Sequence, residues 1–305
     1  MTDDTGRPGS PGGESEATVV RGRWARLGLP GLVDLHVHFL PPRVLAKVWA
    51  FFDALREPDG TPAWPVRYRG DDDERLRLLR AFGVRAFPTL CYPHKPDMAA
   101  WLNSWAAEFA AAAGPDVLPS ATVYPEPGAP AYLQAALDAG ARVVKVHLRV
   151  GDVEPRDPLL DPVWGLLAET GTPVVVHAGS GPHPGPTTGP APFAQVLARH
   201  PRLVAVVAHM GDTEYGEFLD LAERFPRVHL DTTMAFTDFT ERRSPYPRDL
   251  LPRLADLGDR VVLGSDFPNI PYPYAHQLEA LERLGLGDDW LRAVWHDNGA
   301  RLLGL

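Results

Sequence analysis

Two histidines separated by one residue, His36 and His38, stand near the end of an apolar segment, 31–39. In a β-strand, side chains two residues apart point to the same side, so both imidazoles are expected to face one point, and Asp34 is expected to lie on the same face. Two converging imidazoles are suitable ligands for a divalent transition metal such as zinc, manganese or iron. The pair alone is a weak signal, because buried histidines are usually hydrogen-bonded core residues.

Three further apolar runs also end at a side chain that could bind a metal or transfer a proton. His177, His209 and Asp266 each follow a run of mostly aliphatic residues. Any one of them could be an ordinary buried polar group. Five such groups at the ends of four runs are hard to obtain by chance, and we therefore predict a catalytic metal site.

Another apolar run, 142–150, carries three basic residues at every second position. Lys145, His147 and Arg149 share one face of this predicted strand, and aliphatic residues share the other. The aliphatic face should meet the surrounding helices, so the basic face should line the site. Lys145 and Arg149 would then bind an anionic substrate such as a carboxylate, for which arginine offers a bidentate fork. Alternatively, Lys145 pairs with a buried acid, Asp34 or Asp231.

The arrangement of apolar runs along the chain indicates the fold that brings these residues together. The runs lack polar alternation, which is typical of strands buried on both faces of a parallel sheet. Each is followed by helical sequence, and no Gly-x-Gly-x-x-Gly turn follows the first one, which counts against a doubly wound sheet. We predict an α/β fold, a (β/α)8 TIM barrel over residues 29–305, with its active site at the C-terminal ends of the strands. The eight predicted strands are 31–39, 84–90, 117–124, 142–150, 173–178, 203–209, 228–232 and 260–266.

Composition narrows the class of protein. The 305 residues are 45% hydrophobic and 23% charged, with a formal net charge of -9, which argues against nucleic acid or an anionic membrane as a partner. The single cysteine, Cys91, excludes a disulfide within the chain and favours a reducing, cytoplasmic setting. No apolar run is long enough to span a membrane. The start of the chain is rich in Gly, Pro, Ser and acidic residues, so residues 1–28 are expected to form a disordered tail.

Some residues are weaker candidates for the site. Asp231 ends the seventh run and could orient a ligand imidazole. His183 lies in a Gly/Pro-rich loop and is expected to be a loop residue, and His94 is expected to lie away from the ligands. Trp64 and Trp164 are expected to serve packing more than substrate binding.

The residues at the strand ends resemble those of a known family. The His36-x-His38 pair, His177, His209, the sequence Gly-Ser-Asp-Phe-Pro at 264–268 and the C-terminal Asn-Gly-Ala-Arg-Leu-Leu-Gly at 298–304 resemble the amidohydrolase superfamily. The chain is most similar to the amidohydrolase-related branch, which holds aminocarboxymuconate-semialdehyde decarboxylase and metal-dependent hydrolases. The resemblance covers residues 31–305.

This resemblance implies a metal centre and a set of roles. His209 would be a catalytic group beside the metal in one-metal members, or a ligand in two-metal members. In two-metal members, a lysine at the place of Lys145 is carbamylated and bridges the ions, but one ion is the rule in the branch that this chain resembles. Zinc is the expected ion, and manganese is the alternative. The resemblance also implies that the protein forms a homodimer. The implied ligands of the single ion are His36, His38, His177 and Asp266.

The leading hypothesis is a metal-dependent hydrolase. A metal-activated water would attack an amide, ester or lactone of a small carboxylated substrate, with Asp266 as the base and His209 steadying the oxyanion. Lys145, His147 and Arg149 would bind the substrate. The alternative is a non-oxidative decarboxylase of the same branch, in which Asp266 or His209 supplies a proton to carbon. A barrel that binds a metal or ligand without turnover is a third reading, against which the complete set of ligands and base argues.

Overall fold

The barrel strands run parallel and in the order of the sequence. The structure is a computed structural model, and it describes residues 14–305. The two short strands β3 and β4 are the halves of the third predicted strand, separated at Pro119. The strands are β1 (Leu32–Val33), β2 (Val84–Pro88), β3 (Val117–Leu118), β4 (Ser120–Thr122), β5 (Val143–His147), β6 (Val174–His177), β7 (Ala205–Val207), β8 (Val228–Asp231) and β9 (Val261–Val262).

The sheet closes on itself, which makes it a barrel. β1, β2 and β3 are adjacent, as are β4 to β9 in order, and all these pairs are parallel. The segments 32–38 and 261–267 then meet at what we call the closing junction. There the amide of Leu35 donates to the carbonyl of Leu263 at 2.8 Å, and Val37 forms a parallel bridge with Phe267. The predicted (β/α)8 barrel is confirmed, although its first and last strands are shorter than expected.

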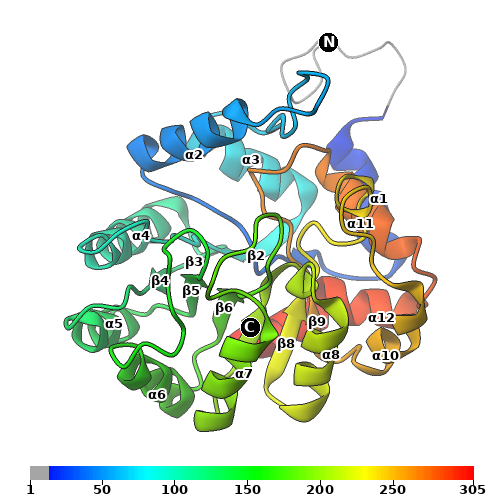
Figure 1. Cartoon of the computed structure of the whole chain (residues 1–305). Coiled ribbons are helices and arrows are strands. Elements are labelled where there is room, and N and C mark those ends of the chain that lie inside the picture. Colours follow the sequence, from blue (N-terminus) through cyan, green and yellow to red (C-terminus); the bar gives the residue numbers. More distant parts are fainter. Residues whose placement is uncertain (1–13) are drawn as a thin grey trace.

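Helices alternate with the strands and surround them (Figure 1). They follow the local sequence signals: α3, for example, begins after Asp71, whose side chain accepts from the amide of Glu74, and ends at Gly83 in the left-handed conformation. In the part of the chain that the structure describes, no helix is both long and apolar enough to cross a bilayer. The helices are α1 (Glu16–Arg26), α2 (Pro42–Ala54), α3 (Asp72–Phe82), α4 (Ala99–Ala113), α5 (Ala129–Asp138), α6 (Asp161–Thr170), α7 (Pro190–Arg199), α8 (Tyr215–Arg224), α9 (Asp238–Glu241), α10 (Leu251–Asp256), α11 (Tyr274–Glu282), α12 (Asp288–Arg292) and α13 (Asn298–Leu303). The structure also has 3-10 turns at Ala208–Gly211 and Arg248–Leu250 and a π turn at Ala293–Asp297.

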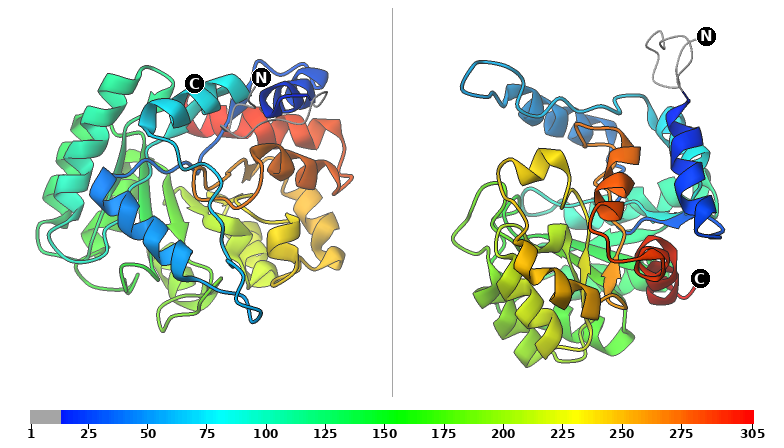
Figure 2. Two further views of the ribbon diagram at one scale, coloured as in Figure 1. Left: turned by 90° about the horizontal axis from the view of Figure 1, so that it is seen from above. Right: turned by 90° about the vertical axis from the view of Figure 1, so that its right-hand side faces the viewer.

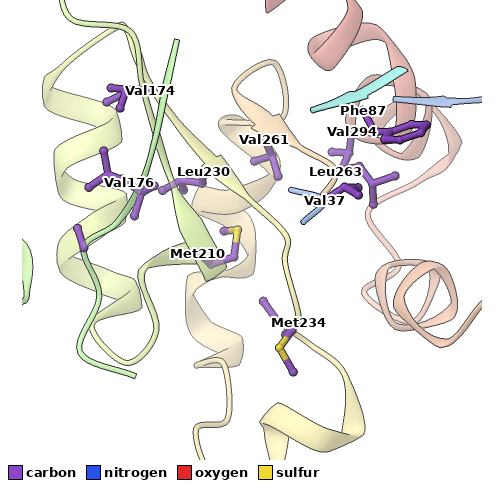
Figure 3. Packing of buried hydrophobic residues seen from close by; sticks show 14 of the residues in the cluster. Val37, Phe87, Val174, Val176, Met210, Leu230, Met234, Val261, Leu263 and Val294 are labelled. Atoms are coloured by element: carbon purple, nitrogen blue, oxygen red, sulfur yellow. The ribbon is translucent and has the colours of Figure 1, made fainter. Parts of the chain in front are cut away.

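The core has two layers, as the strand pattern predicts. One cluster of buried residues fills the barrel and includes Val143, Val175 and, from α13, Leu303. A larger cluster lies between the strands and the helices; Figure 3 shows part of it, with Val174 and Leu230 labelled. Alternate residues of one strand therefore face opposite layers, which is what turns every second side chain of β5 toward the inside of the barrel.

The predicted disordered tail, 1–28, is wrong for its second half. Residues 1–13 lie outside the described residues, but Glu16–Arg26 form helix α1, which packs beside α3 and α11 (Figure 2). Val20 is fully buried, and the indole of Trp24 donates to the carbonyl of Phe82 at 2.9 Å. The composition of the first 17 residues suggested disorder, whereas the apolar residues that follow give this helix a buried face.

Candidate metal centre

A cavity of about 600 Å³ opens at the C-terminal ends of the strands. Such a volume accommodates a small organic molecule. It is the place where a barrel of this type carries its active site. Every residue that the sequence assigned to the site lies on its wall: His36, His38, Lys145, His147, Arg149, His177, His209 and Asp266.

The two histidines of the His-x-His pair direct their Nε2 atoms toward Asp266. His36 donates from Nδ1 to Oδ2 of Asp231 at 2.8 Å, and His38 donates from Nδ1 to the carbonyl of Leu90 at 2.8 Å. In a neutral ring with Nδ1 protonated, Nε2 carries a lone pair. These Nε2 atoms lie 3.5 Å (His36) and 3.0 Å (His38) from Oδ1 of Asp266. Lone pairs and a carboxylate oxygen therefore converge, an arrangement that a cation stabilises.

Three side chains come close enough to share one ion. Ligand atoms of His36, His209 and Asp266 all lie within 4.8 Å of one another. Burial holds the pKa of His36 and of His209 well below the usual value, so both rings are neutral and can coordinate. Burial opposes ionisation of Asp266, but the imidazoles around this carboxyl group outweigh the effect of burial, and its pKa lies below the usual range. This donor set of neutral nitrogens and an ionised oxygen fits a divalent cation.

His177 lies beside this group rather than within it. Its Nε2 donates to the carbonyl of Gly181 at 2.9 Å, which leaves Nδ1 as the unprotonated nitrogen of the neutral ring. Burial lowers the pKa of His177 to about 4. Its ring stacks on His147, with centroids 4.1 Å apart, and lies 4.5 Å from the ring of His209. The division of roles between His177 as ligand and His209 as catalytic group stays a prediction.

Lys145 points into the centre of the site. Its side chain is buried, and its Nζ donates to Nε2 of His36 at 2.9 Å. Over the described residues, no carboxylate oxygen lies within 4.0 Å of this ammonium, so the alternative pairing with Asp34 or Asp231 is not found. Burial lowers the pKa of Lys145 to about 8, against the opposing effect of Asp231 and Asp266.

Asp34 has a role that the alternation of strand residues did not predict. Instead of facing the cavity, its carboxylate accepts from the backbone amides of His36 and Ser265, each at 3.1 Å, and from the hydroxyl of Tyr274 at 2.8 Å. It is fully buried, and burial raises its pKa to about 7. The sequence signal was the position of Asp34 two residues before His36, but its other two partners, Ser265 and Tyr274, lie more than 230 residues away.

The outer wall of the cavity combines cations with aromatic rings. Arg149 follows β5, and Lys47 comes from α2, in the long segment between β1 and β2. Within residues 14–305, neither side chain has a carboxylate within 4.0 Å. His94 and His183 also lie on this wall. The aromatic residues of the wall are Phe51, Phe52, Trp64, Tyr92 and Phe239, whereas Trp164 is a core residue.

Comparisons with known proteins agree with this architecture. An uncharacterized TIM-barrel protein from Bordetella bronchiseptica is similar with a TM-score of 0.71 and 22% identity, over 90% of this chain and 99% of the other. A structure from Acinetobacter baumannii, named "probable 2-pyrone-4,6-dicarboxylic acid hydrolase" and holding citric acid, gives a TM-score of 0.62 and 13% identity, over 90% of this chain and 100% of the other. A third similar structure is the 5-carboxyvanillate decarboxylase of Novosphingobium aromaticivorans, in complex with manganese and 4-hydroxy-3-methoxy-5-nitrobenzoic acid. Its TM-score is 0.59 and its sequence identity 16%, over 91% of this chain and 97% of the other.

These structural similarities establish the fold. No curated protein matches the chain. A family model described as Amidohydrolase matches residues 33–305, which is most of the sequence and includes every residue of the candidate site. The chain therefore belongs to the amidohydrolase family.

Proposed function

We propose that this protein is a metal-dependent hydrolase that opens an amide, ester or lactone bond in a small carboxylated substrate. The observation that carries the proposal is the convergence of three proposed ligands on the wall of a substrate-sized cavity, where Nε2 of His36 and of His38 lie 3.5 Å and 3.0 Å from Oδ1 of Asp266. His209 lies beside them, with a ring nitrogen within 4.8 Å of the ligand atoms of His36 and Asp266. The amidohydrolase family supplies the reaction class. A neighbour named as a hydrolase of a pyrone dicarboxylic acid has the same fold.

The residues that would hold the ion are the four predicted ligands. One divalent ion per chain, zinc or manganese, is proposed; a manganese complex is known for the neighbouring decarboxylase. When bound, such an ion supplies Lewis acidity, which activates water at neutral pH and polarises a carbonyl group. The proposed ligands are His36, His38, His177 and Asp266.

Asp266 and His209 would perform the proton chemistry. Asp266 is ionised at neutral pH, so it can accept a proton from the attacking water and pass it to the leaving group. His209 is neutral, because burial keeps its pKa well below the usual value, and it can donate one hydrogen bond to the substrate oxygen that gains negative charge.

The cavity wall favours an anionic substrate with an apolar part. The chain has a net charge of -9, yet Lys47, Lys145, Arg149 and Arg243 all lie on this wall. Arg243 pairs with Glu57, which leaves the other three for substrate carboxylates. Aromatic rings on the same wall would pack against a planar or aliphatic substrate body.

A non-oxidative decarboxylase is the second candidate. The aromatic wall favours it, because weak solvation around a substrate carboxylate promotes its loss as neutral carbon dioxide. In that reaction, the proton that replaces the carboxyl group on carbon would come from His209 or, by way of Asp266, from water. The neighbouring 5-carboxyvanillate decarboxylase has the same fold, but fold alone does not decide between the two reactions.

A substrate panel tests the proposal and separates the two reactions. The protein, loaded with Mn²⁺ or Zn²⁺, is incubated with lactones, esters and amides that carry a carboxylate, and with hydroxylated aromatic acids. Release of acid from a lactone or ester without carbon dioxide supports the hydrolase, and carbon dioxide release supports the decarboxylase. The Asp266→Ala variant should be inactive in either case. Absence of turnover across the panel by the metal-loaded protein would contradict both reactions.

Location and assembly stay predictions from the sequence. The single cysteine, Cys91, is buried and unpaired, as in a protein of a reducing compartment, which is the basis for proposing the cytoplasm. A homodimer is proposed from the family resemblance, and light scattering of the purified protein would test it.

A further inference from the structure

The two halves of the metal centre are joined across the closing junction by one buried carboxylate. Asp34 accepts hydrogen bonds from the backbone amides of His36 and Ser265, at 3.1 Å each. His36 and Asp266 are proposed ligands from opposite ends of the sequence, and Ser265 immediately precedes Asp266. The amide of Asp266 also donates to the carbonyl of His36 at 2.8 Å. Asp34 therefore sets the separation of the two backbone segments that carry these ligands.

A buried tyrosine holds the second carboxylate oxygen of Asp34. The hydroxyl of Tyr274, the first residue of α11, donates to Oδ2 of Asp34 at 2.8 Å. The backbone amide of Tyr274 in turn donates to the hydroxyl of Tyr68 at 2.7 Å. Both tyrosines are almost completely buried. The start of α11 is thus held at both its backbone and its side chain.

The N-terminal helix completes this connection. The Tyr68 hydroxyl donates to Oε1 of Glu16 at 2.6 Å, and Glu16 is the first residue of α1. The same oxygen of Glu16 accepts from the amide of Ala275, in the first turn of α11, at 3.4 Å. An acidic side chain at a helix N-terminus is favourable because of the free amides and the helix dipole. Glu16 therefore anchors Tyr68 and the start of α11 together.

Aromatic packing couples the same residues to the other side of the junction. The ring of Tyr68 contacts that of Phe267, with centroids 4.8 Å apart, and Phe267 immediately follows Asp266. The ring of Tyr274 stacks on Phe82 at 5.2 Å. A shift of Tyr68 would thus be transmitted both through Tyr274 and through Phe267, because close-packed interiors transmit displacements.

We infer that helix α1, through Glu16, is a positioning element of the metal centre. Glu16 fixes Tyr68 and the start of α11, Tyr274 fixes Asp34, and Asp34 fixes the backbone of His36 relative to that of Asp266. None of Glu16, Tyr68, Tyr274 and Asp34 lies on the cavity wall, so their effect on the site is indirect. The inference rests on the proposed function, because it concerns how tightly the proposed ligands hold their ion.

The expected loss of metal affinity can be estimated from residues that orient the ligands of other metal sites. Loss of a group that orients a ligand typically weakens metal binding by about 10- to 100-fold. Tyr274→Phe removes only a hydroxyl and should weaken Mn²⁺ binding by about tenfold, at the low end of that range. Glu16→Ala should also weaken Mn²⁺ binding. Glu16→Gln keeps an oxygen that can accept from the Tyr68 hydroxyl, so this variant should bind Mn²⁺ as the unmodified protein does.

The test measures Mn²⁺ affinity of the full chain by competition with a fluorescent chelator, together with thermal unfolding. Two matched controls separate positioning from general stability. Tyr246→Phe also removes a buried tyrosine hydroxyl, but one without a hydrogen-bond partner among the described residues. Glu282→Ala removes an ion pair between α11 and Arg23 of α1 without touching Tyr68. Both controls should bind Mn²⁺ as the unmodified protein does, even where the melting temperature falls.

Two results would overturn the inference, and they are distinguishable. If Tyr274→Phe and Glu16→Ala lower the melting temperature but bind Mn²⁺ as tightly as the unmodified protein, α1 only stabilises the barrel and the proposed function is untouched. If the unmodified protein binds neither Mn²⁺ nor Zn²⁺, the proposed metal centre and the positioning role fail together.

Discussion

The carboxylate of Asp231 accepts a hydrogen bond from Nδ1 of His36 at 2.8 Å. With its other oxygen it accepts from the backbone amides of His209, at 2.8 Å, and Thr233, at 3.1 Å. His209 has a left-handed backbone with a φ of 57°, a conformation that is costly for a residue other than glycine. From the end of β8, Asp231 thus holds the imidazole of His36 in a fixed tautomer. It also holds the backbone of His209 in a strained conformation.

Replacing Asp231 with asparagine should weaken metal binding. The amide group has one acceptor and one donor, so it cannot accept from both His36 and His209 as the carboxylate does. If its NH2 group faces His36, that ring must protonate Nε2, the atom that would bind the ion. We expect about 10- to 100-fold weaker Mn²⁺ binding by chelator competition. Asp256→Asn, an exposed change on α10, is the control, and equal affinity of the two variants would remove Asp231 from this role.

Gly264 should tolerate no side chain, because it lies where His36 and Asp231 meet. A Cβ at this position would approach Oγ1 of Thr233 to 2.1 Å and Cβ of His36 to 2.9 Å. Gly264→Ala should therefore lower the free energy of unfolding by about 1–3 kcal/mol and reduce the bound metal. Gly216→Ala, on α8, adds a methyl group in ordinary contact with Leu250 and is the matched control in urea unfolding. A Gly264→Ala variant with unchanged stability and metal content would show that the packing here is loose.

The fold and the cavity residues at the strand ends could be predicted because they depend on local periodicity. Alternation within β5 placed Lys145 and His147 on the inside, and the strand ends placed His177 and Asp266 at one rim. Residues that depend on distant partners could not be predicted. Asp34 was expected to face the site, but its hydrogen bonds to Ser265 and Tyr274 turn it toward the closing junction.

The N-terminal helix and the outer cavity wall were missed for a related reason. Helix α1 is stabilised by Phe82 and Tyr68, which are more than 50 residues away and leave no signal in the composition of the tail. Lys47 and His94 reach the cavity from segments whose path depends on how α2 packs. The length of the segment 40–69 predicts a loop on the catalytic face, but periodicity does not tell which of its side chains reach the cavity.

Stability should depend on pH through His229, a residue of β8 outside the cavity. Burial, with the charges of Arg260 and Arg301, lowers the pKa of its imidazole to about 4. Between the unfolded value near 6.5 and about 4, only the unfolded chain takes up the proton, so the free energy of unfolding falls as the pH falls through this range. This group alone should account for at most about 2.5 kcal/mol between pH 7.5 and pH 4.5.

The measurement is urea unfolding at these two pH values for the unmodified protein and His229→Gln. Other buried histidines, such as His147, contribute in the same direction, so only the difference between the two proteins reports His229. The variant should lose less stability on acidification. An identical loss in both proteins would contradict the assignment.

Arg149 should contribute to substrate binding more than to turnover. Its guanidinium lies on the cavity wall without a carboxylate partner among the described residues. Arg149→Ala should raise KM for a carboxylated substrate by about 10- to 100-fold with little change in kcat, since a hydrogen bond to a charged group is lost in ground state and transition state alike. Arg156→Ala, at an exposed arginine that pairs with Glu154, is the control. A fall in kcat with unchanged KM would instead place Arg149 in the chemical step.

The most direct test of the metal centre is elemental analysis of the purified protein, of His177→Ala and of His209→Ala. The account predicts about one equivalent of zinc or manganese per chain, its loss in His177→Ala, and its retention in a catalytically inactive His209→Ala. Retention of the metal in His177→Ala, or absence of tightly bound metal from the unmodified protein even after incubation with Zn²⁺ and Mn²⁺, would contradict it.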